Sequence, residues 1–163
     1  MLNTSVLFEC NYNCNIPIVV NQGGSSSGKT VCILQVLAIR AIQEPNSIIT
    51  VVGQDIPNLK RGALRDFEQY VLCDQSISDH VKSYNKSERI YTFTNGSIIE
   101  FESYDNEQDS KNGKRDYLFL NEANGIPYEI YNQLQMRTKK QTFLDYNPSS
   151  DFWVHEKILT LPH

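Results

Sequence analysis

One stretch decides the fold of this chain: Val19-Val20-Asn21-Gln22-Gly23-Gly24-Ser25-Ser26-Ser27-Gly28-Lys29-Thr30. It matches the phosphate-binding pattern G-x-x-x-x-G-K-[ST], whose defining positions are held by Gly23, Gly28, Lys29 and Thr30. A short β-branched run precedes the stretch at residues 16–21, and an apolar run without Gly or Pro follows at residues 31–42. The pattern therefore predicts a buried strand, a P-loop and a helix, in that order.

The side chains of this loop favour binding of a nucleotide. Small residues let successive backbone N–H groups turn inward around phosphate oxygens, and the following helix directs its N-terminus at the same oxygens. We expect the cradle to consist of Gly23, Gly24, Ser25, Ser26, Ser27 and Gly28. Lys29 would place its charge on the β- and γ-phosphates, and the Thr30 hydroxyl would ligate Mg²⁺. A chance match in a flexible linker is disfavoured by the strand and helix patterns on either side.

Length and composition restrict the class of protein. The 163 residues fit one domain, and the formal charge of −4 argues against a generally basic nucleic-acid-binding surface. No run is long and apolar enough to span a membrane, and no signal peptide is visible at the N-terminus. The four cysteines lack the spacing of a metal site, so we expect reduced thiols at Cys10, Cys14, Cys32 and Cys73.

The remaining segments alternate between strand and helix patterns. Strands are predicted at residues 5–8, 47–52, 117–120 and 142–146, and helices at residues 57–73, 127–137 and 151–159. Between them, residues 81–84, 89–94 and 97–103 are short and alternating, with the hairpin signal Asn95-Gly96 before the last one. Residues 104–115 are expected to form an exposed loop. The fold class is therefore α/β, an ASCE-type P-loop NTPase with three layers and a mainly parallel sheet that carries an antiparallel hairpin insert.

A second candidate site follows the apolar strand at residues 117–120. P-loop hydrolases need an acidic group at the end of a strand, which we expect beside the P-loop strand, and a neighbouring glutamate that activates water. Glu122 is the candidate general base; its alternative is a surface carboxylate that caps the next helix. Asn121 stands where an aspartate is expected. Its amide oxygen could accept a hydrogen bond from a Mg²⁺-bound water, although without charge the metal affinity should be lower.

A third candidate site is Asp145-Tyr146-Asn147-Pro148, at the end of the last predicted core strand. A polar side chain at this position can contact the γ-phosphate and respond to its loss, and the amide of Asn147 can both donate and accept hydrogen bonds. Asn-Pro is also a common turn former. From the residues alone the two interpretations stay open.

With these three sites in this order, the chain resembles the large terminase subunit of tailed bacteriophages in its N-terminal packaging-ATPase domain. Residues 23–30 are similar to the family's P-loop, and residues 117–124, ending in Asn121-Glu122-Ala123-Asn124, are similar to its Walker B strand with the catalytic glutamate. Residues 143–148, followed by Phe152-Trp153-Val154, resemble its coupling segment. The P-loop is generic, whereas the combination with the other two motifs is much more specific.

The resemblance implies an ATP-driven motor that assembles as a ring on the procapsid and pumps double-stranded DNA inward. Its implied partners are the portal protein and the small terminase subunit, in the host-cell cytoplasm and transiently at the portal vertex. Lys29 and Thr30 would bind ATP with Mg²⁺, Glu122 would activate water, and Asn147 would couple phosphate release to movement. The family's nuclease domain has an acidic metal cluster, which is not found before His163. We therefore expect residues 1–163 to form one ATPase domain that does not cleave DNA.

Arginines and lysines are the least informative part of the sequence. Many family members carry an arginine in the P-loop where this chain has Ser25, so a transition-state arginine must come from elsewhere. Arg65 and Arg137 are the preferred candidates, ahead of Arg61 and Arg115. Local basic clusters that could contact DNA phosphates lie at residues 60–61, 111–115 and 137–140. Each of these charges could equally belong to an ordinary solvated face.

Three other functions remain open. A helicase-like nucleic-acid-dependent ATPase would be stimulated by free DNA or RNA and would separate strands. A small-molecule kinase would need an arginine-rich lid, which no segment shows. A nucleotide-binding assembly module would bind without turnover, and Asn121 and Ser25 are the residues that keep this interpretation open.

Overall fold

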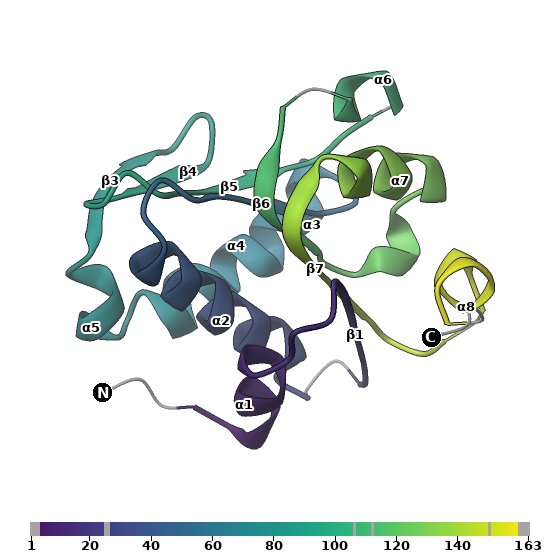
Figure 1. The fold of residues 1–163 in the computed structure, drawn as a ribbon, viewed down its shortest axis with the longest axis horizontal. Helices are drawn as coiled ribbons and strands as arrows, with labels where there is room; N and C mark the ends of the chain where they lie inside the picture. Colours follow the sequence, from purple (N-terminus) through teal and green to yellow (C-terminus); the bar gives the residue numbers. More distant parts are fainter. Residues whose placement is uncertain (1–3, 25–26, 106, 112, 150, 160–163) are drawn as a thin grey trace.

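The computed structural model describes residues 4–24, 27–105, 107–111, 113–149 and 151–159. Its centre is a seven-stranded sheet in the order β1-β7-β6-β2-β5-β4-β3 (Figure 1). The strands are β1 (Ile18–Gln22), β2 (Ile48–Val52), β3 (Val81–Asn85), β4 (Ile90–Phe93), β5 (Ile98–Glu102), β6 (Arg115–Leu120) and β7 (Thr138–Tyr146).

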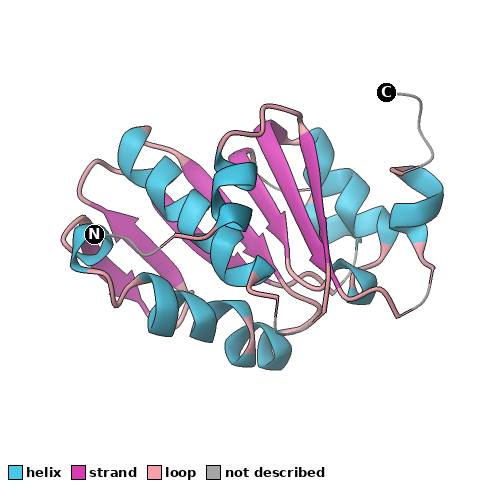
Figure 2. Cartoon of the chain, turned by 90° about the horizontal axis from the view of Figure 1, so that it is seen from below, coloured by secondary structure: helices cyan, strands magenta, loops and turns pink. Residues whose placement is uncertain are grey.

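Helices cover both faces of the sheet, which confirms the predicted three-layer α/β architecture (Figure 2). One side carries α1 (Val6–Tyr12), α2 (Lys29–Gln43), α3 (Ile56–Arg61), α4 (Ala63–Asp66), the π-helical turn η1 (Phe67–Val71) and α5 (Gln75–Ser78). The other side carries α7 (Tyr128–Met136) and α8 (Trp153–Lys157), with the 3₁₀ turn η2 (Ala123–Gly125) before them. The short helix α6 (Glu107–Ser110) lies within the predicted loop at residues 104–115. No helix in the described ranges is long and apolar enough to cross a membrane.

The five neighbouring strands β1, β7, β6, β2 and β5 are parallel, and the sheet is antiparallel at its other end. β4 runs antiparallel to both of its neighbours, β5 and β3. The turn between β4 and β5 contains Asn95 and Gly96, and Gly96 has a φ of 87°, a conformation that favours glycine. This arrangement confirms the predicted antiparallel insert at the edge of a parallel sheet.

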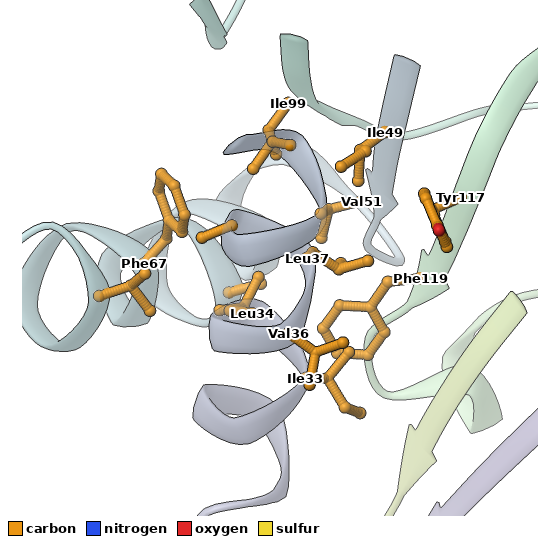
Figure 3. Close-up of a cluster of buried hydrophobic side chains, with 14 of the residues drawn as sticks. Ile33, Leu34, Val36, Leu37, Ile49, Val51, Phe67, Ile99, Tyr117 and Phe119 are labelled. Atoms are coloured by element: carbon orange, nitrogen blue, oxygen red, sulfur yellow. The ribbon is translucent and has the colours of Figure 1, made fainter. Parts of the chain in front are cut away.

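The central helix α2 is buried on nearly all sides. Its side chains Ile33, Leu34, Val36 and Leu37 are fully buried against strands of the sheet and against η1, as Figure 3 shows. Strand β6 alternates between the two cores: Tyr117 and Phe119 contact the α2 side, whereas Leu118 and Leu120 contact the α7 side. Burial on both faces explains why this strand reads as a continuous apolar run rather than an alternating one.

The predicted strand at residues 5–8 is wrong, because these residues lie at the start of helix α1. The Ser5 hydroxyl caps the helix by accepting the Phe8 N–H at 3.2 Å. Phe8 is buried on the α2 side of the sheet and stacks on Tyr12. A run of four residues cannot distinguish strand from helix by periodicity, and here packing against α2 favours the helix.

The predicted single helix at residues 57–73 is divided into α3, α4 and η1. Asp55 caps α3 by accepting the Asn58 N–H at 2.7 Å, and the chain then bends at Gly62, with φ −104° and ψ −105°. A Cβ at Gly62 would lie 3.0 Å from the Asn58 carbonyl oxygen and 3.4 Å from Oδ1 of Asn121. The bend therefore lets this segment approach the end of β6 closely.

We expect Leu37→Ala to lower the free energy of unfolding by about 2–5 kcal/mol, because it removes a fully buried side chain and leaves a cavity. Val6→Ala is the control: Val6 is 78% exposed, and its substitution should change the free energy by no more than about 0.5 kcal/mol. Urea unfolding followed by circular dichroism measures both. Equal effects of the two substitutions would contradict the central position of α2.

Candidate functional site

The P-loop connects β1 to α2 at the edge where the parallel strands end. Gly28 caps α2 with a φ of 76°, so the last turn of the loop requires a conformation that glycine adopts without strain. The Gly23 N–H donates to the Tyr146 carbonyl oxygen at 3.2 Å, which ties the start of the loop to the end of β7. Ser25 and Ser26, two of the predicted cradle residues, lie outside the described residues.

Lys29 links the P-loop to the segment after β7. Its side chain is largely buried, and Nζ donates to the Gly24 carbonyl oxygen at 3.0 Å and to Oδ1 of Asn147 at 2.8 Å. The sequence predicted separate phosphate-binding roles for Lys29 and Asn147. The structure brings the two side chains into direct contact, so a movement of the Lys29 side chain would change the hydrogen bonding of Asn147.

A buried carboxylate, Asp145, occupies the centre of the site. Its Oδ2 accepts the Thr30 hydroxyl at 2.6 Å, and its Oδ1 accepts the Glu122 N–H at 2.6 Å. Nδ2 of Asn121 donates to the same carboxylate at 3.1 and 3.2 Å and lies 3.4 Å from the Thr30 hydroxyl. Asn121 thus directs its amino group, and not the amide oxygen that the sequence analysis expected, toward Thr30.

Asp145 is 0% exposed, and burial raises its pKa to about 6. Hydrogen bonds from Thr30 and from the Glu122 N–H, together with the charge of Lys29, act in the opposite direction and limit this shift in pKa. Above pH 7 the carboxylate therefore predominates. The predicted site residue of this segment is Asn147, and Asp145 was missed, although a carboxylate inside an apolar core strand is the signal that could have identified it.

Glu122 follows β6 in an unusual backbone conformation. Its φ of 52° and ψ of 59° are left-handed, which costs a non-glycine residue about 1–2 kcal/mol. The hydrogen bond from its N–H to Asp145 holds this turn in place. The side chain is exposed and, among the described residues, has no hydrogen-bond partner. Its carboxylate is thus available to a ligand in the cavity beside it.

A cavity of about 100 Å³ joins the predicted site residues. Its lining consists of Lys29, Thr30, Gly62, Asp66, Asn121, Glu122, Asp145 and Asn147. Asp66 comes from α4 and was not singled out by the sequence; burial raises the pKa of its carboxyl, against the opposing charge of Arg65. Three carboxylates therefore face one cavity, and of these Asp145 is the one that hydrogen-bonds Thr30.

The order of the strands explains how these residues meet. The predicted position of the strand before Glu122, directly beside the P-loop strand, is wrong, because β7 lies between β1 and β6. All three strands are parallel, so their carboxyl ends share one edge of the sheet. This is the edge at which α/β sheets bind ligands.

A family model described as phage terminase large subunit matches residues 15–160 of the chain. The chain belongs to this terminase family. The resemblance inferred from the three motifs is thereby confirmed. No curated protein sequence matches the chain.

Solved terminase structures share the fold. The large terminase of a thermophilic bacteriophage superposes with a TM-score of 0.76 at 16% identity, over 94% of this chain and 40% of that one. The Thermus phage P74-26 large terminase ATPase domain gives 0.74 at 13% identity, over 94% and 68%. The first of these proteins, in complex with ATP-γ-S, gives 0.70 at 14% identity, over 94% and 39%. The fold is therefore that of terminase ATPase domains, and this chain spans about two fifths of the first protein.

A second hollow of about 340 Å³ adjoins the P-loop of this terminase chain. Ser27, Gly28, Cys32 and Gln35 line it, together with Tyr70, whose side chain is 56% exposed. Its volume is within the range of small-molecule sites, and Tyr70 is its one aromatic lining residue among the described residues. Tyr12, an aromatic residue near the N-terminus, is not among the residues that line this hollow; its hydroxyl hydrogen-bonds Gln43 at the far end of α2, and its ring lies against Arg40.

The candidate arginines of this terminase chain lie in different surroundings. Arg65 is exposed on α4, next to Asp66, and Arg61 is exposed at the end of α3. Arg137 precedes β7, a strand of nine residues, so it lies about 25 Å from the cavity at the other end of that strand. Arg137 is therefore too far from this cavity to contact a ligand bound in it.

Arg115 does not fit the role of a transition-state arginine. It is 3% exposed; Nε donates to the Thr50 hydroxyl and Nη1 to the Leu134 carbonyl oxygen, each at 3.0 Å. Its predicted position in an exposed loop is wrong, since it is the first residue of β6. Arg115 holds α7 against the sheet.

We expect Arg115→Ala to lower the free energy of unfolding by about 3 kcal/mol, because it leaves a cavity and two buried oxygen acceptors without their donors. Arg65→Ala, on an exposed side chain, should change it by about 0.5 kcal/mol or less. Chemical denaturation of both variants provides the measurement. A destabilised Arg65→Ala beside an unaffected Arg115→Ala would reverse the two assignments.

Proposed function

We propose that this chain is the ATP-hydrolysing motor domain of a DNA-packaging terminase, which drives double-stranded DNA into the procapsid. The observation that carries the proposal is the convergence of Lys29, Thr30, Glu122 and Asn147 on one cavity, at the carboxyl edge of a terminase-type sheet. The proposed domain comprises residues 1–163. Its proposed partners are the portal protein and the small terminase subunit, and its proposed state is a ring, assembled in the host-cell cytoplasm.

The P-loop would bind the triphosphate of ATP. Gly28 and the first turn of α2 supply backbone N–H groups, and Lys29 supplies the positive charge nearest to them. The hydroxyl of Thr30, with oxygen-bearing side chains around it, suits a hard cation such as Mg²⁺, which prefers oxygen ligands. Bound Mg²⁺ would neutralise charge on the β- and γ-phosphates. The hollow beside Tyr70 is the candidate position of the adenine.

Glu122 is the proposed general base. Its carboxylate is exposed to the cavity and lacks a competing partner in the described part of the chain, and its backbone is held by Asp145. Both properties favour an orientation toward a water molecule that attacks the γ-phosphate. The left-handed conformation at Glu122 is a backbone cost of the kind that accompanies functional residues.

Asn147 is the proposed coupling residue. Its Oδ1 accepts a hydrogen bond from Nζ of Lys29, a donor for which a bound γ-phosphate would compete. Arrival and departure of that phosphate would therefore change the hydrogen bonding of Asn147 and move the segment after β7. Trp153 follows on α8 and bonds the Ile126 carbonyl oxygen before α7, so the movement would reach the far face of the sheet.

Some of the basic residues that could contact DNA line one hollow, whereas others are paired with acidic side chains. Pairing of β6 with β7 places Lys114 and Lys139 around one hollow of about 270 Å³ with Arg137. Lys140 is instead engaged by Glu44 at 2.6 Å, and Lys111 by Glu107 at 3.7 Å. Lys114, Arg137 and Lys139 are therefore the proposed phosphate contacts, without sequence readout.

Lys29→Ala should abolish binding of ATP in the presence of Mg²⁺, since it removes the positive charge that would contact the β- and γ-phosphates. Isothermal titration calorimetry is the measurement, and Lys139→Ala, an exposed lysine at the opposite edge of the sheet, is the control. Micromolar binding by the Lys29 variant would refute the P-loop assignment.

Glu122→Gln should keep ATP binding and lower steady-state hydrolysis by about 10²- to 10⁴-fold, since the amide cannot take a proton from water. Glu129→Gln, an exposed carboxylate on α7, is the matched control. Hydrolysis should be measured over a range of protein concentrations, because a rate per subunit that rises with concentration would indicate an arginine from a neighbour. An unchanged rate in the Glu122 variant would move the base elsewhere, and binding without turnover in the native chain would favour the assembly-module alternative.

A further inference from the structure

We propose that Asp145 supplies the magnesium-site carboxylate that P-loop ATPases ordinarily place at the position of Asn121. The acid and the amide have exchanged strands: the carboxylate lies near the end of β7, and its amide partner directly follows β6. The inference rests on the proposed binding of ATP with Mg²⁺. In this role Asp145 accepts the hydrogen bond of the Thr30 hydroxyl and supplies a negative charge next to the proposed magnesium site.

The register of the sheet makes this exchange geometrically simple. Leu120 of β6 pairs with Leu144 of β7, so Asn121 and Asp145 are the next positions along two adjacent parallel strands. Their side chains lie side by side, with Nδ2 of Asn121 3.1 and 3.2 Å from the two carboxylate oxygens. Either member of such a lateral pair can carry the acid and still face Thr30.

The hydrogen bonds around Asp145 identify it as the anionic member. The Thr30 hydroxyl, the Asn121 amino group and the Glu122 N–H all donate to it, so the described contacts of this side chain use it purely as an acceptor. Asn121 cannot play this part in the observed arrangement, because its amino group occupies the side that faces Thr30. A negative charge therefore lies 2.6 Å from the proposed magnesium ligand despite the neutral residue after β6.

The other carboxylates of the cavity do not offer the same contact. Glu122 reaches Asp145 through its backbone, and its side chain is exposed. Asp66 lies on α4, and its described interaction is with the charge of Arg65. A rival explanation is that Asp145 merely stabilises the loop after β6. The two explanations differ in whether removal of its charge weakens the response of ATP affinity to Mg²⁺.

The test measures the dissociation constant of ATP by isothermal titration calorimetry, once with Mg²⁺ and once with EDTA. The ratio of the two constants is the magnesium enhancement. Asp145→Asn should reduce this enhancement about tenfold or more, as expected for the loss of one charge near the ion, and should leave affinity in EDTA within about threefold. Asp66→Asn, which removes a charge from the same cavity without a contact to Thr30, is the comparison.

The reciprocal double variant Asn121→Asp/Asp145→Asn gives the sharper result. Asn121→Asp alone sets two carboxylates against each other and should lower the unfolding temperature in EDTA, whereas the double variant restores one acid and one amide. We expect the double variant to recover both the unfolding temperature and the magnesium enhancement. If Asp145→Asn does not fold, Asp145→Ser keeps a hydrogen-bonding oxygen without the charge and carries the same expectation for the enhancement.

A magnesium enhancement equal to that of the unsubstituted chain, in a folded Asp145→Asn or Asp145→Ser variant, would overturn the inference and favour the purely stabilising role. Loss of enhancement in Asp66→Asn with retention in Asp145→Asn would transfer the role to Asp66. Failure of the native chain to bind ATP under either condition would instead contradict the proposed function, so the two failures are distinguishable. Calorimetry detects each of these outcomes without a measurement of turnover.

Discussion

The buried carboxylate of Asp145 is the interaction on which the arrangement of the site depends. It accepts hydrogen bonds from Thr30 at the start of α2, from the Asn121 side chain and from the Glu122 backbone. Two segments that are distant in the sequence, the start of α2 and the residues after β6, are thereby tied to one pair of oxygen atoms in β7. Because an unpaired buried charge is costly, these donors must remain in place for the folded state to keep its stability.

The surrounding sheet makes this burial achievable. β7 lies between β1 and β6, and helices cover both faces, so Asp145 is shielded from water while the carboxyl ends of the strands remain open to the cavity. The same edge presents the N-terminus of α2 and the ammonium group of Lys29. Their positive potential favours the ionised carboxylate and would also favour phosphate groups. One electrostatic arrangement thus serves both stability and the proposed nucleotide site.

Much of the fold was predictable because its signals are local. The P-loop, the Asn95-Gly96 hairpin and the apolar strands each depend on residues that are close together in the chain. Two errors arose where local patterns were ambiguous or overridden. Residues 5–8 form part of a helix because α2 offers a surface for packing, and the segment of residues 57–73 bends at Gly62, a residue that often interrupts helices.

The sequence by itself determined the family, the α/β class and most of the residues that line the cavity, because motif spacing records chemistry along the chain. Only the tertiary structure decided the order of β1, β7 and β6, the burial of Arg115 and the contact between Lys29 and Asn147. It also decided that the carboxylate beside Thr30 comes from β7. The physical reason is that lateral neighbours in a parallel sheet are set by strand pairing across long connections, and linear spacing carries no record of that pairing.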